Sequence, residues 1–137
     1  MFASITPDRV AQVIVRAREI DARVGPWEEF DRLHPDEEEA DSVLEARRQD
    51  PARQALVAFL SELSEEELAE LVALMWLGRG SFDPEEWSEA LSTAREEHSG
   101  IAGTVRYLLG EPLLADYLEE GLDRLGYPVS QIEGDVR

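Results

Sequence analysis

The sequence contains no cysteine and no lysine. The absence of cysteine excludes disulfide bonds, thiolate nucleophiles and zinc–thiolate sites. The longest uninterrupted apolar run is Leu71–Leu77, far shorter than the roughly 20 residues that a membrane-spanning helix needs. The first residues also lack the basic and apolar regions of a signal peptide. We therefore expect a cytoplasmic protein that does not enter a membrane.

Positive charge is scarce throughout the chain. The sequence has 31 acidic residues against 13 basic ones, all arginine, for a net charge of −18. Proteins that bind DNA, RNA or anionic lipid need clustered cations, so we expect no nucleic-acid partner. Two interpretations of the acidity remain open. It forms either a solvated surface or a mimic of nucleic acid that occupies the groove of a basic partner.

Helix signals separate almost every apolar segment from the next. Capping residues, prolines at first helical positions and stop glycines flank apolar residues that recur at helical spacing. The predicted helices cover residues 7–24, 36–48, 51–63, 65–77, 84–98, 101–109 and 112–125. No segment shows sustained two-residue alternation, so we expect no sheet. The prediction is an all-α compact bundle of about six to seven helices.

The length fits one domain, which we expect to span residues 1–137. Residues 1–50 would supply accessory N-terminal helices, residues 51–126 the helical core, and residues 127–137 a flexible tail. Gly121 lies inside the last predicted helix, where glycine costs about 1 kcal/mol relative to alanine. We expect the close approach of another helix to compensate for this cost.

The helix predicted from residue 65 has an unusually apolar C-terminal end. Its start, Ser64 to Glu67, has the form of a capping box. Its end, Leu74–Leu77, is apolar on every side and must be buried, either inside the domain or against a partner. Leu74, Trp76 and Leu77 are therefore candidate partner-binding residues. We expect Gly78 to end this helix in a left-handed conformation.

The stretch LGRGSFDPEEW follows, and it has the helix–loop–helix outline of an EF-hand. An alignment that places Gly80 on the invariant loop glycine puts Met75, Leu77 and Arg79 where calcium needs side-chain oxygens. We therefore expect no calcium, no other metal and no cofactor. Gly78, Gly80 and Trp87 have the pattern of a structural loop that leads into the next helix.

Arg79 has two interpretations, as a contact residue for a partner or anion and as a partner of nearby helix carbonyls or carboxylates. Tyr107 and Tyr117 are most simply core aromatics. They would line a ligand pocket only if their hydroxyls converge with Arg79.

Three motifs resemble a bacterial family of unknown function, number 3775. They are LMWLGRG at residues 74–80, YLLG with Pro112 at residues 107–112, and YLEEGL at residues 117–122. The resemblance covers roughly residues 59–126. It implies a small bacterial helical domain and assigns no chemistry.

The leading functional hypothesis is a non-enzymatic protein-interaction module that contacts its partner, or a second copy, through Leu74–Leu77 and the Arg79 loop. The first alternative is an acidic nucleic-acid mimic or inhibitor that occupies a basic partner. The second alternative is a small-ligand binder or enzyme centred on Arg79, Tyr107 and Tyr117.

Overall fold

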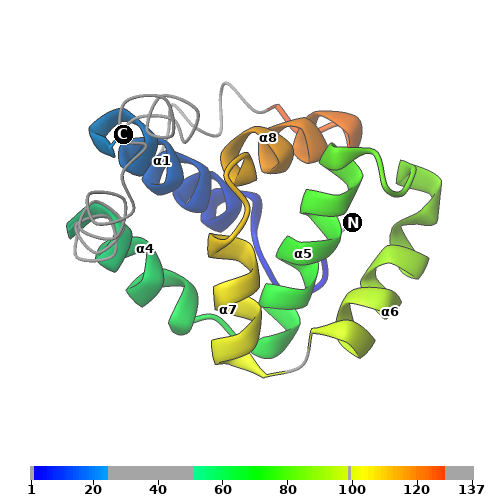
Figure 1. The fold of residues 1–137 in the computed structure, drawn as a ribbon. Helices are drawn as coiled ribbons and strands as arrows, with labels where there is room; N and C mark the ends of the chain where they lie inside the picture. Colours follow the sequence, from blue (N-terminus) through cyan, green and yellow to red (C-terminus); the bar gives the residue numbers. More distant parts are fainter. Residues whose placement is uncertain (1, 25–50, 99, 129–137) are drawn as a thin grey trace, which may run out of the picture.

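A computed structural model describes residues 2–24, 51–98 and 100–128 of the chain. Within these residues the chain forms helices and no strand, which confirms the all-α prediction (Figure 1). The helices are α1 (Pro7–Val24), α4 (Pro51–Ser61), α5 (Glu65–Arg79), the short 3-10 helix η1 (Pro84–Glu86), α6 (Trp87–Glu97), α7 (Ile101–Leu109) and α8 (Leu114–Arg124). The helix predicted at 36–48 and the tail from residue 129 lie outside the described residues.

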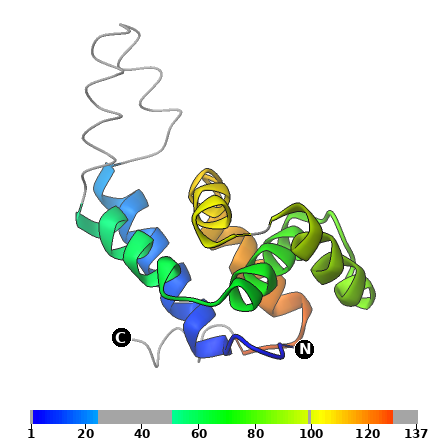
Figure 2. The ribbon, with the colours of Figure 1, turned by 90° about the horizontal axis from the view of Figure 1, so that it is seen from below.

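Helix α5 forms the centre of the bundle. Every residue from Glu67 to Leu77 is buried. Helices α6, α7 and α8 all pack against α5, and α1 packs against α4 and α8. In Figure 1, α6 lies along one side of α5. Figure 2 shows α1 and α4 side by side, on the side of α5 away from α6. Burial on all sides is therefore a consequence of the position of α5 in the fold.

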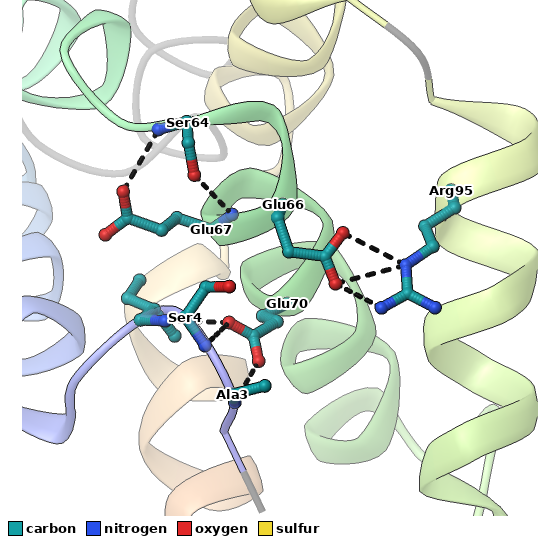
Figure 3. Close-up of polar contacts among 8 residues, drawn as sticks. Ala3, Ser4, Ser64, Glu66, Glu67, Glu70 and Arg95 are labelled. Carbon is teal, nitrogen blue, oxygen red and sulfur yellow. Dashed lines mark hydrogen bonds and ion pairs between the residues drawn. The ribbon is translucent and has the colours of Figure 1, made fainter.

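The carboxylates of the N-terminal turn of α5 connect it to α1 and α6, and Figure 3 shows the capping box and the Glu66–Arg95 pair. The predicted capping box is present: Ser64 Oγ accepts the Glu67 N–H at 3.1 Å, and the Ser64 N–H donates to Glu67 Oε1 at 3.1 Å. Glu67 also pairs with Arg9 of α1. Glu66 accepts Arg95 Nε of α6 on both carboxylate oxygens, at 3.1 and 3.0 Å. Carboxylates are favoured at this end because the helix dipole is positive there.

The C-terminal end of α5 differs from the prediction. The helix continues through Gly78, and Gly80 is the residue in the left-handed conformation, with φ of 89°. The Gly80 N–H donates to the Leu77 carbonyl, and the Ser81 N–H donates to the Trp76 carbonyl. This pair of hydrogen bonds is a Schellman motif. The expected left-handed cap at Gly78 was therefore wrong, because Gly78 serves a different contact.

That contact is the crossing of α5 and α8. A Cβ atom at Gly78 would lie 1.8 Å from the backbone oxygen of Tyr117 on α8. A Cβ atom at Gly121 would lie 2.5 Å from the backbone oxygen of Leu74 on α5. Each helix thus supplies one glycine at the point where the other helix's backbone touches it. The close helix approach expected at Gly121 is confirmed.

Helix α1 contributes to the same core as the helices that follow. Val10, Val13 and Ile14 are fully buried and belong to one apolar cluster with residues of α4, α5 and α8. Ile5, just before α1, is buried in it as well. This part of the segment predicted as accessory therefore completes the central core. Residues 25–50 lie outside the described part of the chain.

We predict that Gly78→Ala and Gly121→Ala each destabilise the protein by about 1–3 kcal/mol or more, because the added methyl forces two packed backbones apart. Gly103→Ala is the matched control. Gly103 lies on α7 with nothing within 4 Å of its Cβ position, so alanine should be neutral or stabilise by about 0.4–1 kcal/mol. Urea unfolding of the three variants measures these changes. Equal stability of the Gly78, Gly121 and Gly103 variants would contradict the backbone contact.

The Glu66–Arg95 pair predicts a pH dependence. The hydrogen bond from Arg95 lowers the pKa of Glu66 below its ordinary value of 4.5. A carboxylate with a lowered folded-state pKa stabilises the protein above its unfolded-state pKa and loses that contribution as the pH falls through the folded-state value. Arg95→Gln should therefore destabilise the protein at neutral pH and have a shrinking effect well below pH 4.5.

Urea unfolding of wild type and Arg95→Gln at neutral and acidic pH measures this difference. Arg106→Gln is the control, because Arg106 is exposed on α7 and no ion pair within the described residues involves it. A difference between Arg95→Gln and wild type that stays constant across the acid range would rule out the Glu66 linkage.

Candidate functional site

Arg79 lies at the exposed end of α5, beside the left-handed turn at Gly80. Its Nε donates to Ser81 Oγ at 3.1 Å, so its described hydrogen bond stays within the same loop. No described ion pair joins it to a carboxylate. The structure therefore leaves the guanidinium accessible, and its role as a contact residue stays a prediction.

The apolar end of α5 is covered by the domain itself. Leu74 and Leu77 have no exposed surface, and Trp76 is 4% exposed. The sequence left two explanations for this burial, packing inside the domain and contact with a partner. The structure supports packing inside the domain. The assignment of Leu74, Trp76 and Leu77 to a partner surface was wrong, because α6, α7 and α8 all pack against this helix.

Tyr107 belongs to an aromatic cluster formed by Trp76, Phe82, His98 and Tyr107. The Trp76 Nε1–H donates to the Tyr107 hydroxyl at 2.9 Å. The His98 ring stacks on Tyr107 with 4.0 Å between centroids, and Phe82 stacks on Trp76 at 5.8 Å. Tyr107 is only partly buried. The hydrogen bond satisfies the buried indole, which is the ordinary requirement of a core tryptophan.

Tyr117 lies on α8 at the helix crossing, where its backbone oxygen faces Gly78. Its side chain is half-buried against the core. None of the described hydrogen bonds or ring contacts joins Arg79, Tyr107 and Tyr117 to one another. Tyr107 is engaged by Trp76 and His98 instead. The described contacts therefore do not assemble the ligand site considered from the sequence.

The loop and helix after Arg79 form an acidic edge, by which we mean the exposed carboxylates of residues 83–97. Its members are Asp83, Glu85, Glu86, Glu89, Glu96 and Glu97. Asp83 and Glu86 are tied by the bond from the Asp83 N–H to Glu86 Oε1, at 2.8 Å. Arg95 is the cation within this stretch, and Glu66 of α5 engages it. Among the described residues, no cation pairs with the carboxylates of the acidic edge.

Trp87 is buried at the start of α6, with Ala90, Leu91 and Ala94 on the same inward side. Within the described fold, α6 packs mainly against α5 and η1 (Figure 1). The opposite side of α6, which carries Glu89 and Glu96, is exposed. The acidic edge therefore lies along one border of the bundle.

A second polar feature is the carboxylate of Glu70, which has no exposed surface (Figure 3). Glu70 Oε2 accepts the Ala3 N–H at 2.7 Å. Glu70 Oε1 accepts the N–H groups of Ser4 and Ile5 at 2.9 and 2.7 Å. One side chain of the central helix thus binds three consecutive backbone amides of the segment before α1. A buried carboxylate needs such donors to replace its lost water.

The same segment is held by aromatic contacts next to Glu70. The Phe2 ring stacks on Tyr127, with 5.2 Å between centroids and 8° between planes. It also meets the edge of Trp87 at 5.6 Å and 69°. Tyr127 was assigned to the flexible tail from the sequence, yet its ring packs on the core. Residues 2–5 are therefore held by the side chains of Phe2 and Ile5 at the two ends and by the backbone amides of residues 3–5.

Sequence reasoning did not single out Glu70, Phe2 or Tyr127. Glu70 follows Glu65, Glu66 and Glu67, so it resembles a continuation of the acidic first turn. Its only distinguishing signal is its position between apolar residues on both sides. The partner amides lie more than sixty residues away in the chain, which no local pattern reveals.

Within the described residues, no group of three or more histidine, aspartate or glutamate side chains is arranged to hold a metal ion. None of the described helices combines the length and the apolar content that crossing a membrane requires.

No curated protein and no solved structure matches this chain. A family model described as "Protein of unknown function (DUF3775)" matches residues 53–127, which is more than half of the 137-residue chain. The match covers most of α4 and all of α5 to α8, and it includes the three motifs on which the resemblance rested. The chain therefore belongs to the DUF3775 family.

Proposed function

We propose that the protein is a non-enzymatic interaction module that binds a basic protein partner through the acidic edge. The observation that supports this proposal is the set of exposed carboxylates in residues 83–97, with which no described cation pairs. The net charge of −18 adds a long-range attraction for a cationic partner. The partner would bind at the acidic edge.

The other acidic groups near α5 are less suited to this role. Glu66 and Glu67 are engaged by Arg95 and Arg9, and Glu70 is buried. Glu85, Glu89 and Glu96 are exposed, and no hydrogen bond or ion pair of their carboxylates occurs among the described contacts. A partner's arginines could pair with them without breaking an internal contact.

The proposal combines the leading hypothesis with part of the first alternative. One such partner is a basic protein that normally binds nucleic acid. The arginines of that protein would pair with carboxylates in place of phosphates. The alternative of a small-ligand binder at Arg79, Tyr107 and Tyr117 has no comparable support, because those residues share no described contact. We propose a cytoplasmic location, on the basis of the cysteine-free composition alone.

We predict that Glu85→Gln/Glu89→Gln/Glu96→Gln weakens binding of an oligoarginine peptide by about tenfold. Each exposed charge pair contributes about 0.5 kcal/mol, so losing three removes about 1.5 kcal/mol. The effect should fade at high salt, because the Debye length falls from about 10 Å at 0.1 M to about 3 Å at 1 M. Fluorescence anisotropy of the labelled peptide measures the affinity at both salt concentrations.

The matched control is Glu19→Gln/Glu62→Gln/Asp123→Asn, which removes the same charge from exposed positions outside residues 83–97. It should weaken binding by less than about threefold, through the general field only. Equal losses of affinity in the two triple variants would show that the acidity acts diffusely, and the proposed role of the acidic edge would then be rejected.

A further inference from the structure

The segment at residues 2–5 is bound by the core in the manner of a peptide ligand. We define the docking slot as Glu70, Trp87 and Tyr127, which contact this segment. These three residues come from α5, from the start of α6 and from the chain just after α8. All three lie within residues 53–127, which match the family model, whereas the bound segment lies outside that match.

Glu70 recognises backbone and not side chains. Its two oxygens accept the N–H groups of Ala3, Ser4 and Ile5. Any residue except proline supplies such a donor. This part of the slot therefore requires three consecutive residues with free amides and places no demand on what they carry.

The selectivity comes from the two ends of the segment. Phe2 stacks on Tyr127 and meets the edge of Trp87, contacts that favour an aromatic ring at this position. Ile5 is 3% exposed and belongs to the core, so its position favours an aliphatic side chain. Ala3 and Ser4 are exposed. The slot thus fits a sequence of the form aromatic–x–x–aliphatic, with no proline in its last three positions.

We propose that the docking slot accepts residues 2–5 of a second copy of this chain, so that two molecules exchange these segments. An exchanged segment would make every contact that it makes within its own chain, which is why swapping identical elements is a low-cost route to dimers. The exchanged segment itself brings no negative charge to Glu70, because residues 2–6 have no charged side chain and Ala3, Ser4 and Ile5 present amide N–H groups to its carboxylate. The net charge of −18 on each chain opposes association, so exchange should strengthen as salt screens this repulsion.

The internal segment competes with any external one. A short covalent connection gives it an effective concentration of about millimolar, so exchange is suppressed in dilute wild-type protein. A test must therefore disable the segment in one molecule and the slot in another. Ser4→Pro removes the central amide donor of the segment at an exposed position. Glu70→Gln leaves the segment intact and weakens the slot, since an amide has one acceptor oxygen.

The experiment mixes the two full-length variants and follows association by sedimentation velocity. Ser4→Pro has an intact slot without a competent segment, and Glu70→Gln has a competent segment without an intact slot. A complex with the mass of two chains should appear in the mixture and be absent from either variant alone. Ser4→Ala is the matched control, because it retains the amide donor. Its mixture with Glu70→Gln should remain monomeric.

A labelled peptide of residues 1–8 provides a second measurement that needs only one folded variant. It should bind Ser4→Pro at least about tenfold more tightly than Ser4→Ala, whose slot is filled from within. Phe2→Ala replaces Ser4→Pro if circular dichroism shows that the proline variant is unfolded. Equal peptide binding to the opened and control chains would overturn the slot. Peptide binding without a mixed complex would overturn the second copy as its occupant.

Discussion

Where α8 crosses α5, Gly78 and Gly121 bring two helix backbones into direct contact. A side chain on either glycine would overlap the opposing carbonyl oxygen, at 1.8 or 2.5 Å from its Cβ. This contact sets how α8 lies on α5, and α1 packs against α8 in turn. It also explains two motifs within the family-matched region. The first glycine of LMWLGRG and the glycine of YLEEGL serve the crossing, and Gly80 provides the turn that directs the chain towards α6.

The carboxylates of α5 and those of η1 and α6 have different uses. Three carboxylates of α5 make contacts within the molecule: Glu66 and Glu67 pair with α6 and α1, and Glu70 binds the segment before α1. Those on η1 and α6 lie at the border of the bundle and remain exposed. An internal carboxylate contributes to stability through its donors, whereas an exposed one contributes mainly to the field that a partner meets. The net charge alone does not distinguish these uses.

The helix starts and the fold class were predictable because they depend on local chemistry. The Ser64–Glu67 capping box spans a single turn, and its hydrogen bonds form as expected. The predictions that were wrong concern residues whose neighbours come from elsewhere in the chain. Gly78 was expected to turn the helix, and it instead meets Tyr117. Leu74, Trp76 and Leu77 were assigned to a partner surface, but the domain covers them itself.

By itself, the sequence determined that the protein is helical, acidic and free of cysteine, because composition and the period of apolar residues act within short segments. Only the tertiary structure decided which carboxylates are buried, which glycine faces a backbone, and which aromatic rings meet Phe2. Those outcomes depend on residues that packing brings together across distant parts of the chain, such as Glu70 with Ile5 and Phe2 with Tyr127. The physical cause is desolvation, because a polar group that loses its water on folding must find a hydrogen-bond partner nearby in the folded chain.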